Sequence, residues 1–494
     1  MATIPRTGVA APSGALLSGE RSQENADQER TRAWEEYRYW ALEQPSLTLW
    51  KGNSDPFQSA AVGLVARDYE IIRQAQRFPV FAAWPDKASA VFRAPIADTA
   101  NSHIELQQAM KDEGEIHAIL ASGYHVTAGS SGPNSEVYLG RELAHKTRAV
   151  ALLRQKLLDH GFSDSVATLI RLLISLDFEA GDFTASLVHL RGLWSMSSSL
   201  PDRLLDTQEL IIVSDVWVGL SLLKKPEIPP SRYDPGSRPL QTFDAALRLL
   251  EESEATRFNC YEAETSYRSD TVLSTESFSL LDAANEVVNT KAIMDQVNEA
   301  TIQQDVVWWM HRRATAVSGL LISGYVDAIR SSGSAICSDN LNVRKELDAA
   351  ACLCGILFMN FRFMDSPNNY NFSKTFQMIE PILRRVSQDS GEGVQQEQDD
   401  VFLWLLFMCA MGSDVYAARG DIPYSVWPAR EFRRVCARRK VTDEASIITL
   451  FRQFEYYPQM DDFVKELLSD TVELLDMPIM PWSKWCEILD HYVP

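Results

Sequence analysis

Three acidic residues near the C-terminal end have a spacing that could hold a metal ion. Asp461 and Asp462 are followed about one helical turn later by Glu466, and carboxylate oxygens are the ligands that Mg²⁺ prefers. A helical lyase or cyclase that uses magnesium needs a second acidic set downstream, and none follows here. We therefore interpret these acids as the first turn of a helix, where negative charge complements the helix dipole.

The seven cysteines are spaced too widely for a structural zinc site. Such a site needs paired cysteines or histidines at short spacing, and only Cys352 and Cys354 are close. On a helix this separation points the two sulfurs apart. We expect reduced, buried thiols in an intracellular protein, with no metal or cofactor. The cysteines are Cys260, Cys337, Cys352, Cys354, Cys409, Cys436 and Cys486.

The histidines also lack the pattern of a metal site. His103, His117 and His125 lie near one another in the sequence, but no cysteine or paired carboxylate completes a ligand set. His189 lies beside an apolar helix face, which favours a hydrogen-bonded structural histidine over a ligand.

Asp215 is the acid that most needs a partner, because it lies mid-helix among apolar residues. A buried charge is normally paired, and Arg191 or Arg203 could supply the opposite charge. We favour this structural pair over an acid that binds an effector molecule.

Common catalytic motifs are missing, and we expect a protein that is not an enzyme. The sequence contains no Gly-x-x-x-x-Gly-Lys-[Ser/Thr] and no Gly-x-Gly-x-x-Gly loop for phosphates. It also contains no Gly-x-Ser-x-Gly for acyl transfer. These patterns predict no catalytic, cofactor-binding or metal-binding residue.

One segment concentrates positive charge and has two interpretations. Apolar residues interleave the basic ones, which is typical of an amphipathic helix with a solvated basic face, and we favour this interpretation. The alternative is a nuclear-import patch or a phosphate contact. The basic residues are Arg430, Arg433, Arg434, Arg438, Arg439 and Lys440.

The overall composition is that of an acidic globular protein. Of 494 residues, 46% are hydrophobic and 23% are charged, which is enough apolar material for a buried core. The formal net charge of −20 opposes binding to phosphate backbones, so direct DNA binding is doubtful. No signal-peptide pattern is present, and the longest apolar run, 401–412, is too short to span a bilayer. We expect a soluble protein of the nucleus or the cytoplasm.

Apolar periodicity predicts an all-α protein, a multi-helix array of antiparallel helical hairpins. Phe183, Leu187, Leu190 and Trp194 fall on one helix face, and short breaks between helices favour antiparallel neighbours. Ser163 is a suitable N-cap, and Gly161 suits a left-handed C-cap. The expected helices include 68–78, 143–157, 163–174, 183–194, 210–223, 347–363, 376–386 and 401–418. Residues 104–126 are expected to form one or two helices, and 280–326 is a long run of helical pattern.

Turn-rich and polar stretches divide this helical pattern. We expect residues 1–30 to be a disordered tail and residues 31–494 to be a helical domain. Loops are expected near 127–136, 226–239 and 387–400. The second is Pro-rich and is expected to be an exposed crossover, and the third is acidic and is expected to be mobile.

The order of motifs resembles the regulatory middle domain of fungal-specific transcription factors of the zinc binuclear cluster family. The central stretch, 177–230, has an acidic-Gly turn, a His-Leu-x-Gly-Leu helix, a leucine-rich helix with Asp215 beside Trp217, and Lys-Pro-x-x-Pro. Further stretches of this resemblance are Trp50 to Phe57, the Ala-Cys helix with Asp348 to Cys352 and Phe358 to Phe361, the helix with Phe402 to Phe407, then Trp427, and Leu450 to Phe454.

The resemblance implies a helical transcription regulator of the nucleus. The family's zinc cluster needs six cysteines within a few tens of residues, and the first cysteine here is Cys260. We therefore expect a regulator that acts through protein partners, such as a zinc-cluster factor, with a secondary-metabolite gene cluster as a candidate target. A cluster encoded upstream of a misplaced start codon would also explain the missing cysteines. Two further hypotheses are a helical interaction protein outside transcription and, less favoured, a helical lyase or cyclase.

Overall fold

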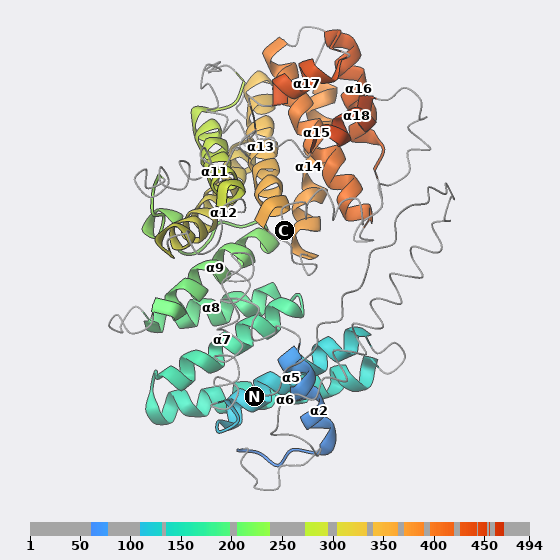
Figure 1. Cartoon of the computed structure of the whole chain (residues 1–494). Helices are drawn as coiled ribbons and strands as arrows, with labels where there is room; N and C mark the ends of the chain where they lie inside the picture. The colour runs from blue at the N-terminus through green and yellow to red at the C-terminus, as the bar shows by residue number, and fades with distance from the viewer. Residues whose placement is uncertain are drawn as a thin grey trace, which may run out of the picture.

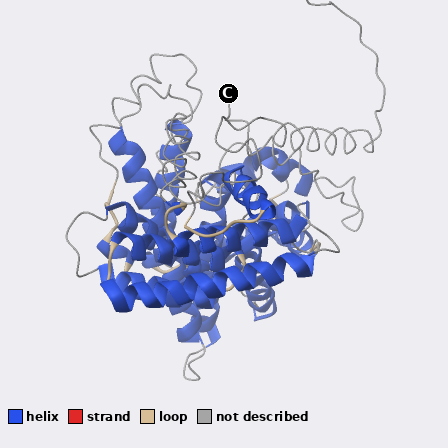
Figure 2. Ribbon diagram, turned by 90° about the horizontal axis from the view of Figure 1, so that it is seen from below, coloured by secondary structure: helices blue, strands red, loops and turns tan. Residues whose placement is uncertain are grey.

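The computed structural model describes residues 61–77, 109–130, 135–197, 205–237, 272–294, 304–332, 339–363, 370–389, 396–418, 425–441, 443–451, 454 and 460–468. All regular secondary structure in these ranges is helical (Figure 2). It comprises 14 α-helices and one short 3₁₀ helix. The all-α prediction is therefore confirmed, and the antiparallel hairpins stay a prediction. The expected tail, 1–30, lies outside the described residues.

The first group of helices forms the lower part of the molecule in Figure 1. Helix α5 packs on α6, α7 on α8, and α8 on α9. These consecutive contacts build a stack that starts at α2 and α5 and ends at α9. The elements are α2 (Ala66–Arg77), α5 (Glu113–Ser130), α6 (Ser135–His160), α7 (Asp164–Glu179), α8 (Phe183–Ser197), α9 (Leu205–Leu222) and the 3₁₀ helix η2 (Pro230–Arg232).

The second group of helices forms the upper part (Figure 1). Helix α13 contacts α11, α12, α14 and α15, and α15 also packs on α16. Helix α9, the last α-helix of the first group, joins the two groups, because it contacts α7 and α8 of its own group and α12 and α14 of the second. The elements are α11 (Thr275–Met294), α12 (Gln304–Ser332), α13 (Asp339–Phe363), α14 (Tyr370–Asp389), α15 (Gln396–Ala418), α16 (Trp427–Arg439), α17 (Glu444–Phe451) and α18 (Asp461–Leu468).

One continuous hydrophobic core includes side chains from both groups. Helix α15 is its most buried element, because all residues from 399 to 414 are buried. The rings of Trp404 and Phe454 stack with their centroids 5.4 Å apart, and Phe407 lies 4.7 Å from Phe451. The prediction of a buried helix at 401–418 is thus confirmed as far as residue 414, although the helix already begins at Gln396. Apolar burial of this kind stabilises the fold at about 25 cal/mol per Å².

The residues that begin and end two of the helices were predicted correctly from the sequence. The Ser163 hydroxyl accepts a hydrogen bond from the backbone N–H of Val166 (3.4 Å), as an N-cap does. Gly161 has a φ of +68°, which is the left-handed conformation expected just after α6. Such signals act over a few residues, so the sequence alone is enough to identify them.

Several predicted boundaries were wrong. The loop expected at 127–136 is shorter, because α5 continues to Ser130 and α6 begins at Ser135. The run of helical pattern expected at 280–326 contains parts of two helices, α11 and α12. The acidic stretch 387–400 is helical at both ends, and Asp399 and Asp400 are buried rather than on a mobile loop. None of the helices in the described ranges is both long and apolar enough to cross a bilayer.

We predict that Gly412→Ala destabilises the protein although alanine is the better helix former by about 1 kcal/mol. A Cβ atom at position 412 of α15 would lie 2.7 Å from Cδ2 of the buried Phe376 ring on α14. Two packed helices must then separate, so the melting temperature should fall. Gly192→Ala on α8 is the matched control, because its Cβ would meet only Met196 at 3.9 Å, and its melting temperature should rise slightly. A rise for both variants would contradict the close packing of α14 and α15.

Candidate functional site

The chain that follows α9 turns back sharply and crosses the junction between the two helix groups. We name residues 223–237 the strap. Leu223 has a left-handed φ of +51°, and the backbone N–H of Lys224 donates to the carbonyl of Gly219 (2.8 Å). A Cβ atom at position 219 would lie 2.9 Å from the carbonyl oxygen of Lys224. Glycine at 219 is therefore what lets the strap start so close to α9.

Asp215 on α9 holds the strap through backbone hydrogen bonds. Its side chain is only 1% exposed, and its two carboxylate oxygens accept from the backbone N–H groups of Glu227 (3.0 Å) and Ile228 (2.7 Å). Burial raises the pKa of this carboxyl to about 6, although both hydrogen bonds favour the charged form. The structural role predicted for Asp215 agrees with this geometry.

One of the two arginines predicted to pair with Asp215 pairs with a different acid. Arg191 forms an ion pair with the Glu227 carboxylate, and Arg203 lies outside the described residues, so its pairing stays a prediction. Both Arg191 and Glu227 are exposed at this ion pair, so it contributes little stability. The buried carboxylate is compensated by main-chain donors, which side-chain charge patterns do not reveal.

The strap is half buried, and not an exposed crossover as the Pro-rich sequence predicted. Pro226, Ile228 and Pro230 are buried, whereas the residues between them are exposed. Burial thus alternates along residues 226 to 230, and every second residue of this segment is buried. The strap thus contributes to the hydrophobic core that α9 and α12 share.

Tyr233 of the strap packs against Gly319 of α12. A Cβ atom at position 319 would lie 2.9 Å from Cγ of Pro230 and 3.1 Å from the Tyr233 hydroxyl. The Tyr233 side chain is 5% exposed, and its hydroxyl has no hydrogen-bond partner within the described part of the chain. Burial, followed by the charges of Asp215 and Asp234, raises the pKa of this phenol. The absent Cβ at Gly319 makes room for the ring.

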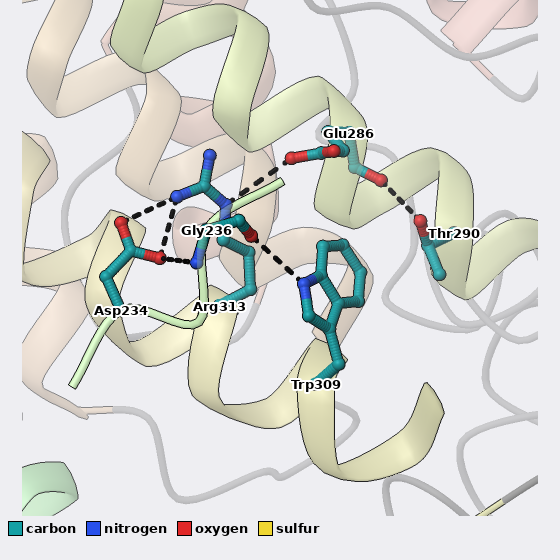
Figure 3. A network of polar contacts seen from close by, with 6 residues as sticks. All are labelled: Asp234, Gly236, Glu286, Thr290, Trp309 and Arg313. Atoms are coloured by element: carbon teal, nitrogen blue, oxygen red, sulfur yellow. Dashed lines mark hydrogen bonds and ion pairs between the residues drawn. The ribbon is translucent and has the colours of Figure 1, made fainter. Parts of the chain in front are cut away.

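An ion-pair network fastens the distal end of the strap to α11 and α12 (Figure 3). The Nη1 group of Arg313 donates to both carboxylate oxygens of Asp234, at 2.8 and 2.7 Å, and its Nε group donates to Glu286 at 3.4 Å. The indole N–H of Trp309 donates to the carbonyl of Gly236 (3.0 Å). The Arg313 side chain is only 12% exposed, so these contacts are little weakened by solvent.

This junction brings together partly buried polar groups from segments that are distant in the sequence. Its groups hold α9, α11 and α12 in a fixed arrangement, and none of those in the described ranges forms a pair of nucleophile and base. Asp215 was identified from the sequence, whereas Asp234, Trp309 and Arg313 were missed. In two of these contacts, Trp309 with Gly236 and Arg313 with Asp234, the partners are more than 70 residues apart along the chain. No local sequence pattern therefore indicates them.

The described cysteines confirm the expectation of buried thiols. Cys352, Cys354, Cys409 and Cys436 are buried and form no disulfide, and burial raises the pKa of Cys436 to about 12. In the ranges that the structure covers, no three His, Cys, Asp or Glu side chains lie together as a metal would need. Asp461 and Asp462 begin α18, in agreement with an acidic first turn. Cys260, Cys337, Cys486 and His103 lie outside the described residues.

The basic segment is a helix, α16, but its basic face is largely paired. Arg438 and Arg439 form ion pairs with the buried Asp399 and Asp400 of α15. Arg434 pairs with Glu431 at 2.5 Å, and the Nε group of Arg433 donates to the carbonyl of Leu467 (2.6 Å). The prediction that the basic face of α16 is exposed only to solvent was therefore incomplete. Charges that are tied to carboxylates attract phosphates less.

His189 has the structural role that the sequence indicated. Its Nε2 atom lies 3.5 Å from Asp177, a fully buried acid that also pairs with Lys146. Burial lowers the pKa of His189 and raises the pKa of Asp177. This contact joins α6, α7 and α8.

A second polar cluster lies between α2, α5 and α6, and the sequence did not indicate it. The buried Tyr124 hydroxyl donates to Asp68 (2.6 Å) and accepts from Arg141 (3.0 Å). The Nδ1 atoms of His117 and His145 lie 2.8 Å apart, so one ring must donate and the other must accept. Burial lowers the pKa of both histidines. His125 instead contacts Glu142 (3.0 Å).

Comparison of the chain with protein-family models, with curated proteins and with solved structures gives no match.

We predict that Asp215→Ala lowers the free energy of unfolding by about 2–4 kcal/mol, because two N–H groups of the strap lose their acceptor. Asp215→Asn should cost less, about 1–2 kcal/mol, because one amide oxygen can still accept one bond. Urea unfolding measures both. Ser221→Ala is the control, since its hydroxyl only donates within α9, to Trp217. Equal stability of wild type and Asp215→Ala would contradict the role of Asp215.

We also predict that the His117–His145 contact makes the fold acid-sensitive. The native pKa of each histidine lies below its ordinary value. The contribution of the two neutral rings to the free energy of unfolding is therefore fully present above about pH 6.5 and is lost as the pH falls below that value. His145→Phe keeps the stacking on Tyr124 and removes the titrating pair. Its unfolding free energy should change less between pH 7.5 and 5.5 than that of the wild type. The same change in both proteins would show that other groups cause the acid sensitivity.

Proposed function

We propose that this chain is a transcription regulator of fungal type that lacks its own DNA-binding zinc cluster and reaches promoters through a protein partner. The observation that carries this proposal is the order of motifs in the sequence. A zinc-cluster transcription factor is the partner class that the resemblance suggests. The nucleus is then the proposed location, with the cytoplasm as the alternative, and a secondary-metabolite gene cluster is a proposed target.

The placement of these motifs supports a regulatory helical domain. The stretch 177–230 covers α8, α9 and most of the strap, the Ala-Cys stretch lies on α13, and the stretch 402–407 lies on α15. Side chains from all three contribute to the same hydrophobic core. Motifs that are far apart in sequence thus belong to one packed unit, as a single regulatory domain requires.

Charge supports recruitment over direct DNA binding. The net charge is −20, and four residues of the basic segment on α16 contact carboxylates or a carbonyl of the same chain. Arg430 and Lys440 are exposed, but two cations neutralise few phosphates, and affinity for DNA depends on that number.

The second proposal is a helical interaction protein outside transcription. The observation that favours it is the exposure of large apolar side chains on α6, where Val137 and Leu143 are 63% and 64% exposed. Large apolar side chains left exposed in this way are candidates for contact with another protein. A lyase or cyclase is the third hypothesis, and magnesium-dependent turnover of the purified chain would distinguish it from both.

Chromatin immunoprecipitation of the tagged, full-length protein in its native host tests the main proposal. We expect discrete enrichment at promoters, and we expect deletion of a zinc-cluster partner to abolish it. Arg430→Glu combined with Lys440→Glu is the control variant, because recruitment through a partner should not depend on these exposed cations. A flat profile with the protein expressed and folded would exclude promoter recruitment. Enrichment that is lost in the control variant would instead indicate direct DNA contact.

A further inference from the structure

Helix α6 exposes an apolar face that no described element covers. Among the described residues, seven large hydrophobic side chains are exposed, and four of them lie on α6. These are Val137, Leu139, Leu143 and Leu158, which are 63%, 42%, 64% and 87% exposed. The other side of α6 packs on α5 and α7 through Ala149, Leu152 and Leu153. The helix therefore has one buried face and a second, exposed face with apolar residues.

The exposed face has the spacing of a coiled-coil seam. Residues 137, 140, 144, 147, 151, 154 and 158 alternate by three and four positions, and all are exposed. This alternation keeps side chains on one stripe that faces a neighbouring helix. Most of these residues are small or apolar, namely Val137, Gly140, Ala144, Thr147, Ala151 and Leu158.

Small residues at the centre of this stripe permit close helix contact. A Cβ atom at Gly140 would meet nothing within 4 Å, so the space outside it is open. If two α6 helices run antiparallel, Gly140 can lie opposite Ala151, and Ala144 opposite Thr147. Both pairs belong to the same register, and a two-fold axis between the helices produces each pair twice.

The same register brings opposite charges together. Arg154 lies in the stripe and Glu136 lies at its edge, next to Val137, and both charged residues are exposed. Within the described residues neither forms an ion pair. In an antiparallel pair with the register above, Val137 lies opposite Arg154 of the partner subunit. Glu136 can then form an ion pair with that guanidinium. The two-fold axis repeats the same ion pair with the roles of the two subunits exchanged. On the other edge, Arg148 is already paired with Glu113 of its own chain at 2.6 Å.

We propose that a second copy of this chain binds this surface, so that the protein forms a dimer through antiparallel α6 helices. The occupant is a second copy because the face is complementary to itself in both shape and charge. The stripe is about 30 Å long, and stable interfaces bury about 1,200–2,000 Å². A single helix pair of this length lies at the lower limit of this range, so we expect a weak dimer that depends on concentration.

Sedimentation equilibrium of the full chain, from about 1 to 100 µM, tests this proposal. The wild type should change from monomer to dimer over this range. Ala144→Asp should weaken association at least tenfold, because it places a carboxylate at the centre of the stripe, close to the same carboxylate of the second copy. Val188→Asp is the control, because Val188 is exposed (62%) but lies on α8, and it should associate like the wild type. A wild type that stays monomeric overturns the proposal, whether the face is free or covered by a different protein.

A charge exchange tests the register. Glu136→Arg alone and Arg154→Glu alone should each weaken association several-fold, because each brings like charges together. The double variant should restore it, since the pair is re-formed with its signs reversed. If both single variants associate like the wild type, or if the double variant remains weak, the antiparallel register is wrong. Circular dichroism confirms folding, which substitutions at exposed positions should preserve.

Discussion

The centre of the molecule depends on one contact, in which the Asp215 carboxylate accepts hydrogen bonds from two backbone N–H groups of the strap. It fixes the first half of the strap to α9. With that half in place, Tyr233 reaches Gly319 of α12, and Asp234 reaches Arg313. A buried carboxylate is costly unless its oxygens are satisfied, so the strap and the acid each require the other.

The strap joins the two helix groups by a combination of apolar and polar contacts. Ile228 and Tyr233 extend the hydrophobic core between α9 and α12, and this burial supplies the non-directional part of the attraction. The polar contacts of Asp215 and Arg313 supply direction, because hydrogen bonds lose strength when their geometry changes. A domain built in this way holds its two halves in one arrangement.

The sequence was sufficient for features that depend on neighbouring residues, and insufficient for contacts between distant ones. The helical class, the cap at Ser163 and the left-handed Gly161 all follow from patterns of a few residues. The burial of Asp399 was missed because its partner, Arg438, lies 39 residues further on. The partner of Asp215 was missed for another reason, since a backbone N–H carries no signature in the sequence.

The position of α9 between the two helix groups has a consequence for synthesis on the ribosome. Its apolar side chains include Ile211, Val216 and Leu220, and α12 and α14 cover part of its surface. Translation proceeds at about 5–20 residues per second, so α14 emerges on the order of ten seconds or more after α9. During this interval the part of α9 that α14 covers is exposed to solvent, and transiently exposed apolar surface of this kind favours aggregation of the nascent chain.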